Sequence, residues 1–285
     1  MDDEDEAVTV SLGAGSTKGI LLDVEGTTTP ISFVHDVLFP FARTRLRSYL
    51  EAHGGSSEVL ADLAKLAAEH HRDLAQGLAP PPWPEGLAPL QDSSSGRLAG
   101  GSAGRQSRSP LPRPREFTAS IESAVAYVQW LMDRDRKSTG LKSLQGKIWR
   151  QGYLDGDLTG RLFPDVPPAL REWHGRGLDV RIFSSGSVLA QKLLFGHSEA
   201  GDLTSCLSGF FDTTTGSKTA PESYGRIAGA FGLPPARILF LSDVTAELDA
   251  ARSAGLQTLH CLRPGNRAQS PGAHSTIETF AAIVI

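Results

Sequence analysis

The chain is poor in the features that mark several large protein classes. Its 285 residues include two cysteines, Cys206 and Cys261, too few for the disulfide framework of a secreted domain. No apolar run approaches the ~20 residues that a membrane-spanning helix needs. Basic residues are not in excess, because the net charge is −4 at pH 7. We therefore expect a globular protein of a reducing compartment, with neither a membrane nor a nucleic acid as its partner.

The start of the chain also lacks a recognisable targeting signal. Five acidic residues follow Met1, whereas secretory and mitochondrial signals are basic. We expect a cytoplasmic protein, with the nucleus as a further compartment if the source is eukaryotic. No exposed apolar repeat demands a partner copy, so we expect a monomer.

What the chain does contain is enough apolar sequence for a full α/β core, with 40% hydrophobic residues. Short apolar runs predict buried strands. Residues 20–22 and 238–241 are such runs, and residues 178–183, in which Asp179 and Arg181 alternate with apolar residues, predict a further strand. The polar residues that follow them are Asp23, the pair Ser184 and Ser185, and Asp243. Ligands of open α/β sheets bind beyond the carboxyl ends of the strands, so these residues are the candidate site.

The first of these strand ends carries two acids. Asp23 and Glu25 point the same way because side chains alternate along an extended segment. Gly26 and the three threonines after it predict a flexible turn whose N–H groups and hydroxyls hold an anion. Two carboxylates beside an anion-binding turn suit chemistry on a phosphate.

A lysine and a third acid complete the pattern. Lys218 comes just before Pro221, which suits the first turn of a helix. A lone lysine is most often a solvated surface charge, and Asp243 could simply cap the helix at Thr245. The order of strand–Asp-x-Glu, strand–Ser, Lys before a helix, and strand–Asp nevertheless resembles the four motifs of the haloacid dehalogenase-like hydrolases. Most members are magnesium-dependent phosphatases with a Rossmann-like parallel sheet.

The resemblance narrows further at Glu25, where most such phosphatases have Asp. Residues 23–40 and 184–198 are similar to the signatures of the enolase-phosphatase E1 family of methionine salvage. The similarity runs from about residue 19 to about residue 265, with one interruption. The activity it implies converts 2,3-diketo-5-methylthiopentyl-1-phosphate, a small phosphorylated diketone, to an acireductone and phosphate, by enolisation and then phosphate removal.

The resemblance also implies roles for individual residues. Asp23 attacks phosphorus and forms an aspartyl-phosphate, while Lys218 holds the charge of Asp23 and of the phosphate. The phosphate is also bound by Ser184 and Ser185. One Mg²⁺ is held by Asp23, Glu25 and Asp243. Glu247, four residues past Asp243, is expected to orient water on the metal.

Two points stay open at Glu25. It associates with the metal through its side chain or its backbone, and acid–base work is an additional role. The base of the enolisation step is either Glu25 or a residue of the cap.

Other functions compete with this one. A generic small-metabolite phosphatase without enolisation is the nearest alternative. A non-catalytic binding protein would have lost Asp23, Lys218 or Asp243, and all three are present. A metal-free dehalogenase is disfavoured because paired acids imply a metal.

The long gap between the first two strands predicts a second domain. We expect a core of residues 17–30 and 165–285, and a helical cap of residues 31–164 that closes over the site and selects substrate. Helical apolar spacing or composition predicts helices at 39–50, 57–74, 121–132 and 141–149. Trp149 is expected in the core of the cap. A stretch rich in Gly, Ser, Pro and Arg, about 93–115, predicts a disordered surface insertion, with a basic docking segment as the alternative.

Overall fold

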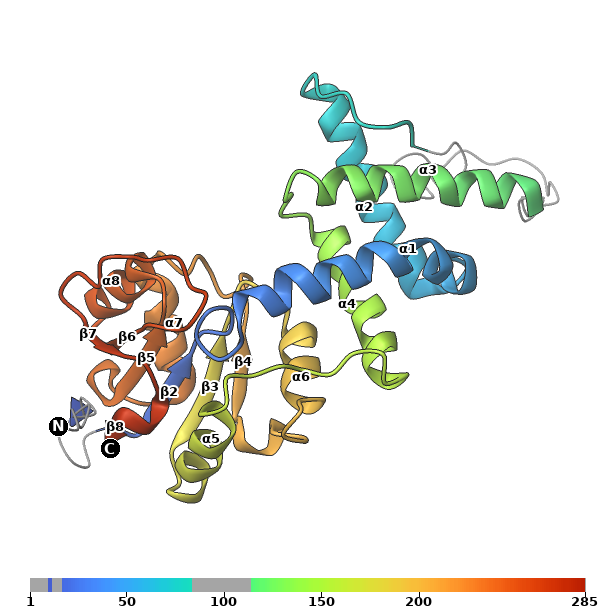
Figure 1. Cartoon of the computed structure of the whole chain (residues 1–285). Helices are drawn as coiled ribbons and strands as arrows, with labels where there is room; N and C mark the ends of the chain where they lie inside the picture. Colours follow the sequence, from blue (N-terminus) through green and yellow to red (C-terminus); the bar gives the residue numbers. More distant parts are fainter. Residues whose placement is uncertain (1–9, 12–16, 84–113, 285) are drawn as a thin grey trace, which may run out of the picture. The chain divides into compact units, whose positions relative to one another are not determined.

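The computed structural model describes residues 10–11, 17–83 and 114–284, and Figure 1 traces the chain. Its strands are β1 (Val10–Ser11), β2 (Gly19–Leu22), β3 (Asp179–Phe183), β4 (Gly209–Phe211), β5 (Ile238–Ser242), β6 (Gln257–Cys261), β7 (Ser275–Ile277) and β8 (Ile283–Val284). Six of them form one parallel sheet in the order β4-β3-β2-β5-β6-β7, and β1 pairs with β8. The predicted α/β class with a parallel core is confirmed.

The helices alternate with these strands in the second half of the chain. The α-helices are α1 (Phe39–His53), α2 (Ser57–Ala75), α3 (Pro114–Met132), α4 (Thr139–Leu154), α5 (Val166–Gly175), α6 (Val188–Gly196), α7 (Pro221–Phe231) and α8 (Thr245–Ser253). Shorter helical segments are the π-helical η1 (Phe33–Leu38) and the 3₁₀ turns η2 (Thr204–Cys206), η3 (Pro235–Arg237) and η4 (Phe280–Ala282). Within the described residues, no helix is both long and apolar enough to cross a membrane.

Helices cover both faces of the sheet, and β2 lies inside it (Figure 1). Helix α8 packs on β5, β6 and α7, while α5 packs against β3. All four residues of β2 are buried, and so are all five of β5. Burial on both faces explains why these strands are continuous apolar runs rather than alternating ones.

The strand order creates a switch point beside β2. From β2 the chain builds β3 and β4 on one side and then returns to build β5 on the other. In parallel sheets, such a reversal opens a crevice at the carboxyl ends of the two strands involved. Leu22 is in register with Leu241, so Asp23 and Asp243 emerge at neighbouring strand ends. The switch point therefore lies where the sequence predicted the site.

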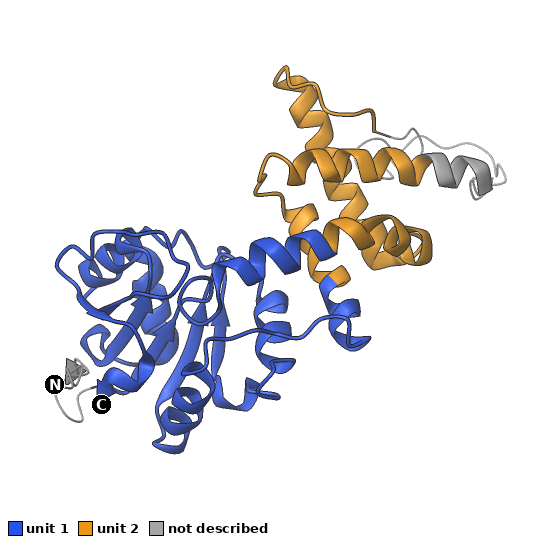
Figure 2. Cartoon of the chain, in the orientation of Figure 1, with its two compact units in different colours: residues 1–41, 149–285 blue, residues 42–148 orange. Residues whose placement is uncertain are grey.

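The chain divides into two compact units, drawn in different colours in Figure 2. Unit 1 comprises Met1–Phe41 and Trp149–Ile285, and unit 2 comprises Ala42–Ile148. The divisions fall inside α1 and α4, whereas we predicted them after residues 30 and 164.

Packing at the ends of α1 and α4 explains the shift of these boundaries. The Trp149 indole donates a hydrogen bond to the Leu38 carbonyl at 2.7 Å. The ring of Phe41 lies so close to Gly152 that a Cβ there would come within 2.5 Å of it. Trp149, predicted for the cap core, therefore belongs to unit 1, because its partners sit just before the first division. Sequence periodicity identifies a helix but not the point along it where packing partners change.

Among the described residues of unit 2, 42–83 and 114–148, all regular structure is helical. All four predicted helical stretches are helices, and leucines such as Leu46, Leu66 and Leu144 are fully buried. Helix α2 is capped by Ser56, whose hydroxyl accepts a hydrogen bond from the Val59 N–H at 3.3 Å. Most of the predicted insertion, residues 93–113, lies outside the described residues. Its last two positions, 114 and 115, were wrongly included, because they begin α3.

Candidate active site

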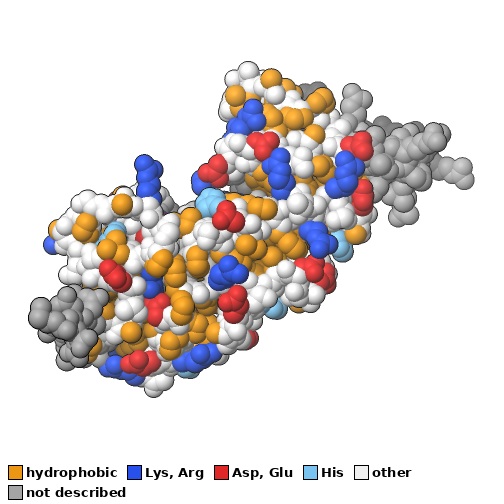
Figure 3. All heavy atoms as spheres, viewed as in Figure 1, with side chains coloured by type: hydrophobic (Ala, Val, Ile, Leu, Met, Phe, Trp, Pro, Cys, Tyr) orange, Lys and Arg blue, Asp and Glu red, His pale blue; other side chains and the backbone are white. Residues whose placement is uncertain are grey.

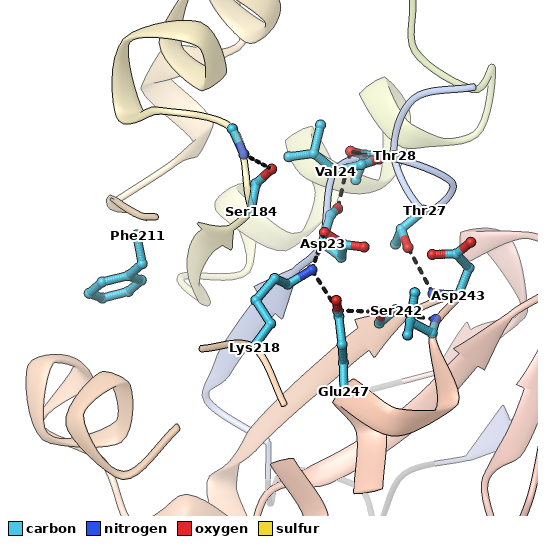
Figure 4. A network of polar contacts seen from close by, with 12 residues as sticks. Asp23, Val24, Thr27, Thr28, Ser184, Phe211, Lys218, Ser242, Asp243 and Glu247 are labelled. Carbon is cyan, nitrogen blue, oxygen red and sulfur yellow. Dashed lines mark hydrogen bonds and ion pairs between the residues drawn. The ribbon is translucent and has the colours of Figure 1, made fainter. Parts of the chain in front are cut away.

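Asp23 and Lys218 form a buried ion pair at the end of β2. The Lys218 Nζ lies 2.6 Å from Asp23 Oδ1, and both side chains are less than a tenth exposed (Figure 4). Lys218 comes from the loop before α7, and the Tyr224 hydroxyl fixes that loop by donating to the Lys218 carbonyl at 2.6 Å. The structure thus brings together two residues that are 195 positions apart, as the motif order predicted.

Glu247 joins this pair. Its Oε2 lies 2.5 Å from Lys218 Nζ and accepts a hydrogen bond from the Ser242 hydroxyl at 3.0 Å. Figure 4 shows Lys218 directed between Asp23 and Glu247. We predicted that Glu247 orients water on a metal. Its observed contacts hold the lysine in place, and the role in orienting water stays a prediction.

Asp243 sits at the end of β5 with one carboxylate oxygen bound and one not. Its Oδ2 accepts from the Asn266 amide at 3.0 Å, whereas Oδ1 is buried without a hydrogen-bond partner among the described residues. Its backbone N–H donates to Thr27 Oγ1 at 3.1 Å (Figure 4). The alternative role as a helix cap is excluded, because α8 starts after Val244 with no side-chain cap.

Burial and neighbouring charges raise the pKa of two carboxylates of the site, Asp243 and Glu247. Burial raises the pKa of Asp243 to about 7, and the charges of Asp23 and Glu247 add to the effect. The pKa of Glu247 is also raised to about 7, by burial and then by Asp23, against the opposing effect of Lys218. Burial lowers the pKa of Lys218, but Asp23 and Glu247 outweigh it and raise this pKa above its ordinary value. The site thus carries an excess of negative charge.

A hard cation fits this excess. Carboxylate oxygens are the protein ligands that Mg²⁺ prefers, and Asp243 Oδ1 is an unsatisfied one. Across the described residues, no three or more His, Cys, Asp or Glu side chains gather into a metal-binding group. The structure therefore does not assemble the side chains of Asp23, Glu25 and Asp243 into one cluster. Mg²⁺ commonly takes only one or two carboxylates and fills its remaining positions with water and phosphate oxygens.

Glu25 lies farther out than the other acids. Its side chain is 44% exposed, and its Oε1 lies 3.0 Å from His35 Nε2. The two residues meet because the π-helical η1 brings His35 back towards Glu25 after the turn. Nothing in the sequence indicated this pairing. A partly exposed carboxylate beside an imidazole is suited to exchanging protons with a substrate.

The turn after Glu25 does not offer an anion site, and that prediction was wrong. The N–H groups of Thr27, Thr28 and Thr29 all donate to the Val24 carbonyl, and the Gly26 N–H donates to Thr29. The three hydroxyls also bond to protein atoms, and all three side chains are fully buried. Gly26 permits this closure because its φ is +76°. The turn is a rigid scaffold for its neighbours.

The serine motif is only partly available to a ligand. Ser184, predicted to bind the phosphate, has its N–H engaged, because this group donates to the Phe211 carbonyl at 3.1 Å. The hydroxyl of Ser184 accepts from the Gly186 N–H at 3.0 Å and keeps its own proton for another acceptor (Figure 4). Ser185 is exposed. The buried Gln191 amide bonds to the carbonyls of Gly186 and Phe211 and so fixes this loop.

Sequence reasoning missed Asn266 and Arg263, which contact the turn after β2. The available signal was weak: Pro264 and Gly265 predict a turn, and that turn follows β6 at the same edge of the sheet. Which side chain of such a turn reaches across two strands depends on tertiary packing.

Comparisons with known proteins agree with this geometry. The family model of haloacid dehalogenase-like hydrolases matches residues 17–255. Enolase-phosphatase E1 of Synechococcus elongatus is 49% identical over 261 residues, which cover 92% of this chain and 95% of that protein. Enolase-phosphatase E1 of Pseudomonas aeruginosa is 46% identical over 269 residues, 94% of this chain and 98% of that one. The crystal structure of the Saccharomyces cerevisiae UTR4 protein matches with a TM-score of 0.67 and 29% identity, over 93% and 98% of the two chains.

Proposed function

This chain belongs to the enolase-phosphatase E1 family of haloacid dehalogenase-like hydrolases, and from that membership we propose its reaction. It converts 2,3-diketo-5-methylthiopentyl-1-phosphate to an acireductone, 1,2-dihydroxy-3-keto-5-methylthiopentene, and phosphate in methionine salvage. The observation that carries the proposal is the buried Asp23–Lys218 pair at the switch point, beside the unsatisfied carboxylate oxygen of Asp243.

Mg²⁺ is the proposed cofactor, one per subunit, with Asp23 and Asp243 as its carboxylate ligands. Glu25 is the third proposed ligand, through its backbone or its side chain. When bound, Mg²⁺ neutralises phosphate charge and polarises the substrate's oxygens. The excess negative charge around Asp243 supports this assignment.

Asp23 is the proposed nucleophile of phosphate removal. One of its carboxylate oxygens bonds to phosphorus while the bond from phosphorus to the substrate oxygen breaks. Lys218 stays protonated beside it and balances the charge of the transferring phosphoryl group. Ser184 and Ser185 contribute hydroxyl groups to the phosphate. Water then attacks the aspartyl-phosphate and releases free phosphate and Asp23.

Glu25 is the proposed base of the enolisation step. Its carboxylate takes a proton from the substrate carbon, and a proton returns to the carbonyl oxygen to give the enol. The contact with His35 Nε2 supports this role, because a hydrogen bond at 3.0 Å orients the carboxylate and gives it a partner for proton exchange. A residue of the predicted cap, residues 31–164, is the alternative base.

The remaining expectations follow from family membership and composition. We propose that unit 2 is the cap that distinguishes substrates, that the protein acts as a monomer on a small molecule, and that it works in the cytoplasm.

The test follows both half-reactions on the wild type and on two variants, Asp23→Asn and Glu25→Gln. Absorbance records formation of the enol and of the acireductone, and a phosphate assay records release, with and without Mg²⁺. We expect an enol signal followed by Mg²⁺-dependent release in the wild type. Asp23→Asn should accumulate enol without release, and Glu25→Gln should slow enol formation.

Other results would change the assignment in defined ways. Phosphate release without a kinetically competent enol would mean a generic phosphatase. An unchanged rate of enol formation in Glu25→Gln would assign the base to a residue of the predicted cap. No turnover with any divalent metal would contradict the proposed function.

A further inference from the structure

The segment after β6 reaches back to the turn after β2. The Asn266 amide Nδ2 donates to the Gly26 carbonyl at 2.8 Å and lies 3.0 Å from Asp243 Oδ2. One amide therefore joins the loops that follow β2, β5 and β6. An amide NH₂ group has two protons to donate, and these two acceptors use both.

The orientation of this amide is fixed by its neighbours. A flipped side chain would place the Asn266 carbonyl against the Gly26 carbonyl and Asp243 Oδ2, both of which are acceptors. In the observed orientation, Asn266 Oδ1 is buried without a hydrogen-bond partner among the described residues. Leaving a buried acceptor unsatisfied costs free energy. That cost indicates a role for the two donor contacts, since native proteins seldom leave buried polar atoms unsatisfied without one.

The contact decides which oxygen of Asp243 is left over. The terminal torsion of an aspartate is soft, so a carboxylate without outside contacts rotates readily. Asn266 binds Oδ2, and Oδ1 is the oxygen without a partner. The amide therefore holds the carboxylate plane and reserves Oδ1 for another ligand.

Gly26 is part of the same arrangement. A Cβ at this position would lie 2.4 Å from Asp243 Oδ2 and 3.0 Å from Asn266 Nδ2. The amide and the carboxylate thus pack directly on bare backbone, which a larger residue would push apart. The Gly26 contact makes the position of Asn266 independent of Asp243 itself.

Arg263 anchors the segment that carries Asn266. In its buried guanidinium, Nε donates to the Thr27 carbonyl at 3.1 Å and Nη1 donates to Asp165 Oδ2 at 2.8 Å. The rings of Phe163 and Phe280 lie 4.8 and 4.5 Å from the guanidinium carbon. The Asn266 N–H in turn donates to the Arg263 carbonyl at 3.1 Å. These contacts fix the backbone from which the Asn266 amide extends.

We propose that Asn266 is a positioning residue, whose amide orients the Asp243 carboxylate so that Oδ1 is presented to the Mg²⁺ ion. This inference rests on the proposed function, which supplies the metal. Hydrogen bonds to metal-binding carboxylates fix ligand orientation, and their loss typically weakens metal affinity about 10- to 100-fold.

The test measures Mg²⁺ affinity by isothermal titration calorimetry on the full chain. Asn266→Ala removes both donor contacts, and Asn266→Ser retains one shorter donor. Gln269→Ala is the matched control, because it removes an exposed amide from the same segment. We expect the dissociation constant to rise about 10- to 100-fold in Asn266→Ala, less in Asn266→Ser, and not at all in Gln269→Ala. Phosphate release by Asn266→Ala should recover as Mg²⁺ is raised.

A melting curve in EDTA separates positioning from folding. Positioning predicts similar melting temperatures for Asn266→Ala and Gln269→Ala without metal. If Asn266→Ala binds Mg²⁺ within about twofold of the control, or if neither Asn266 variant folds, the inference is overturned. A wild type that neither binds Mg²⁺ nor releases phosphate overturns the proposed function as well, whereas a functional wild type confines the failure to Asn266.

Discussion

Both units bury acidic side chains, but they balance them differently. In unit 2, Asp62 and Asp73 are each about 1% exposed. Every oxygen of these two carboxylates is bound by a cation or a hydroxyl, with Lys65 and Lys147 as partners of Asp62, and Arg136 and Tyr127 as partners of Asp73. These acids are part of closed networks.

The buried acids of the candidate site in unit 1 are not balanced in this way. Asp23 and Glu247 share Lys218, and Asp243 keeps a buried oxygen without a partner among the described residues. A buried charge without a partner is costly, so the arrangement needs a reason outside stability. The comparison teaches that an uncompensated charge, rather than burial alone, distinguishes a ligand site from a structural network.

The largest expected effect tests the acids around Lys218 in unit 1. Asp23→Asn should reduce phosphate release by on the order of 10³-fold or more, because the amide oxygen is a poor nucleophile. Its folding should change little, since Lys218 keeps its contact with Glu247. Single-turnover phosphate release and urea unfolding measure the two quantities. A variant that loses both equally would mean that Asp23 supports the fold as Asp73 does.

The matched substitution in unit 2 should behave in the opposite way. Asp73→Asn removes the charge that binds Arg136 and weakens the acceptor of the buried Tyr127 hydroxyl. We expect a loss of about 2–4 kcal/mol in the free energy of unfolding. Activity per folded molecule should be retained. Urea unfolding, with phosphate release normalised to the folded fraction, checks both statements, and full stability in this variant would contradict the closed-network account.

The sequence predicted the part of this contrast that depends on local pattern. Continuous apolar runs identified β2 and β5, and the residues after them located Asp23 and Asp243 at one edge of the sheet. The motif order added Lys218. The sequence could not show that Glu247 would bind Lys218, or that the hydroxyls after Gly26 would turn inward.

These details depend on contacts between distant segments. Asn266 meets Gly26 across 240 positions, and no period or spacing encodes such a contact. The division between the units was displaced for a similar reason, because Trp149 packs on Leu38 rather than within its own helical neighbourhood. Local patterns specify elements, and side-chain partners emerge only when the elements pack.

A smaller effect should appear in the pH dependence of metal-free protein. Because the pKa of Glu247 is raised from 4.5 to about 7, the folded state binds its proton more tightly than the unfolded state does. As pH rises from about 4.5 to 7, the free energy of unfolding of the wild type should therefore fall by roughly 1–3 kcal/mol relative to that of Glu247→Gln. Above about pH 7 the difference between the two proteins should stay constant. Urea unfolding in EDTA measures it. If the wild type instead gains stability relative to Glu247→Gln as pH rises, the pKa of Glu247 is lowered in the folded state and the prediction is wrong.

The smallest effect concerns an exposed pair in unit 2. Charged side chains of both signs are interspersed on the face shown in Figure 3. Arg43 and Asp133 lie 2.6 Å apart, but their side chains are 43% and 54% exposed. Asp133→Asn should change the free energy of unfolding by less than about 1 kcal/mol. Urea unfolding beside Asp73→Asn makes the comparison direct, and a loss as large as that of the buried acid would contradict the role of burial.

The strand order also has a consequence for synthesis of the protein. Strand β2 is made early, yet its partners β3 and β5 follow only after the helices of unit 2. About 220 residues separate β2 from the end of β5, which a ribosome moving at about 5–20 residues per second needs roughly 10–45 s to add. Until both neighbours are made, the apolar strand β2 lacks at least one of its sheet partners on the nascent chain. All of unit 2 is synthesised before either neighbour of β2 in the sheet is made. The first strand of the six-stranded sheet to be translated is therefore enclosed only late.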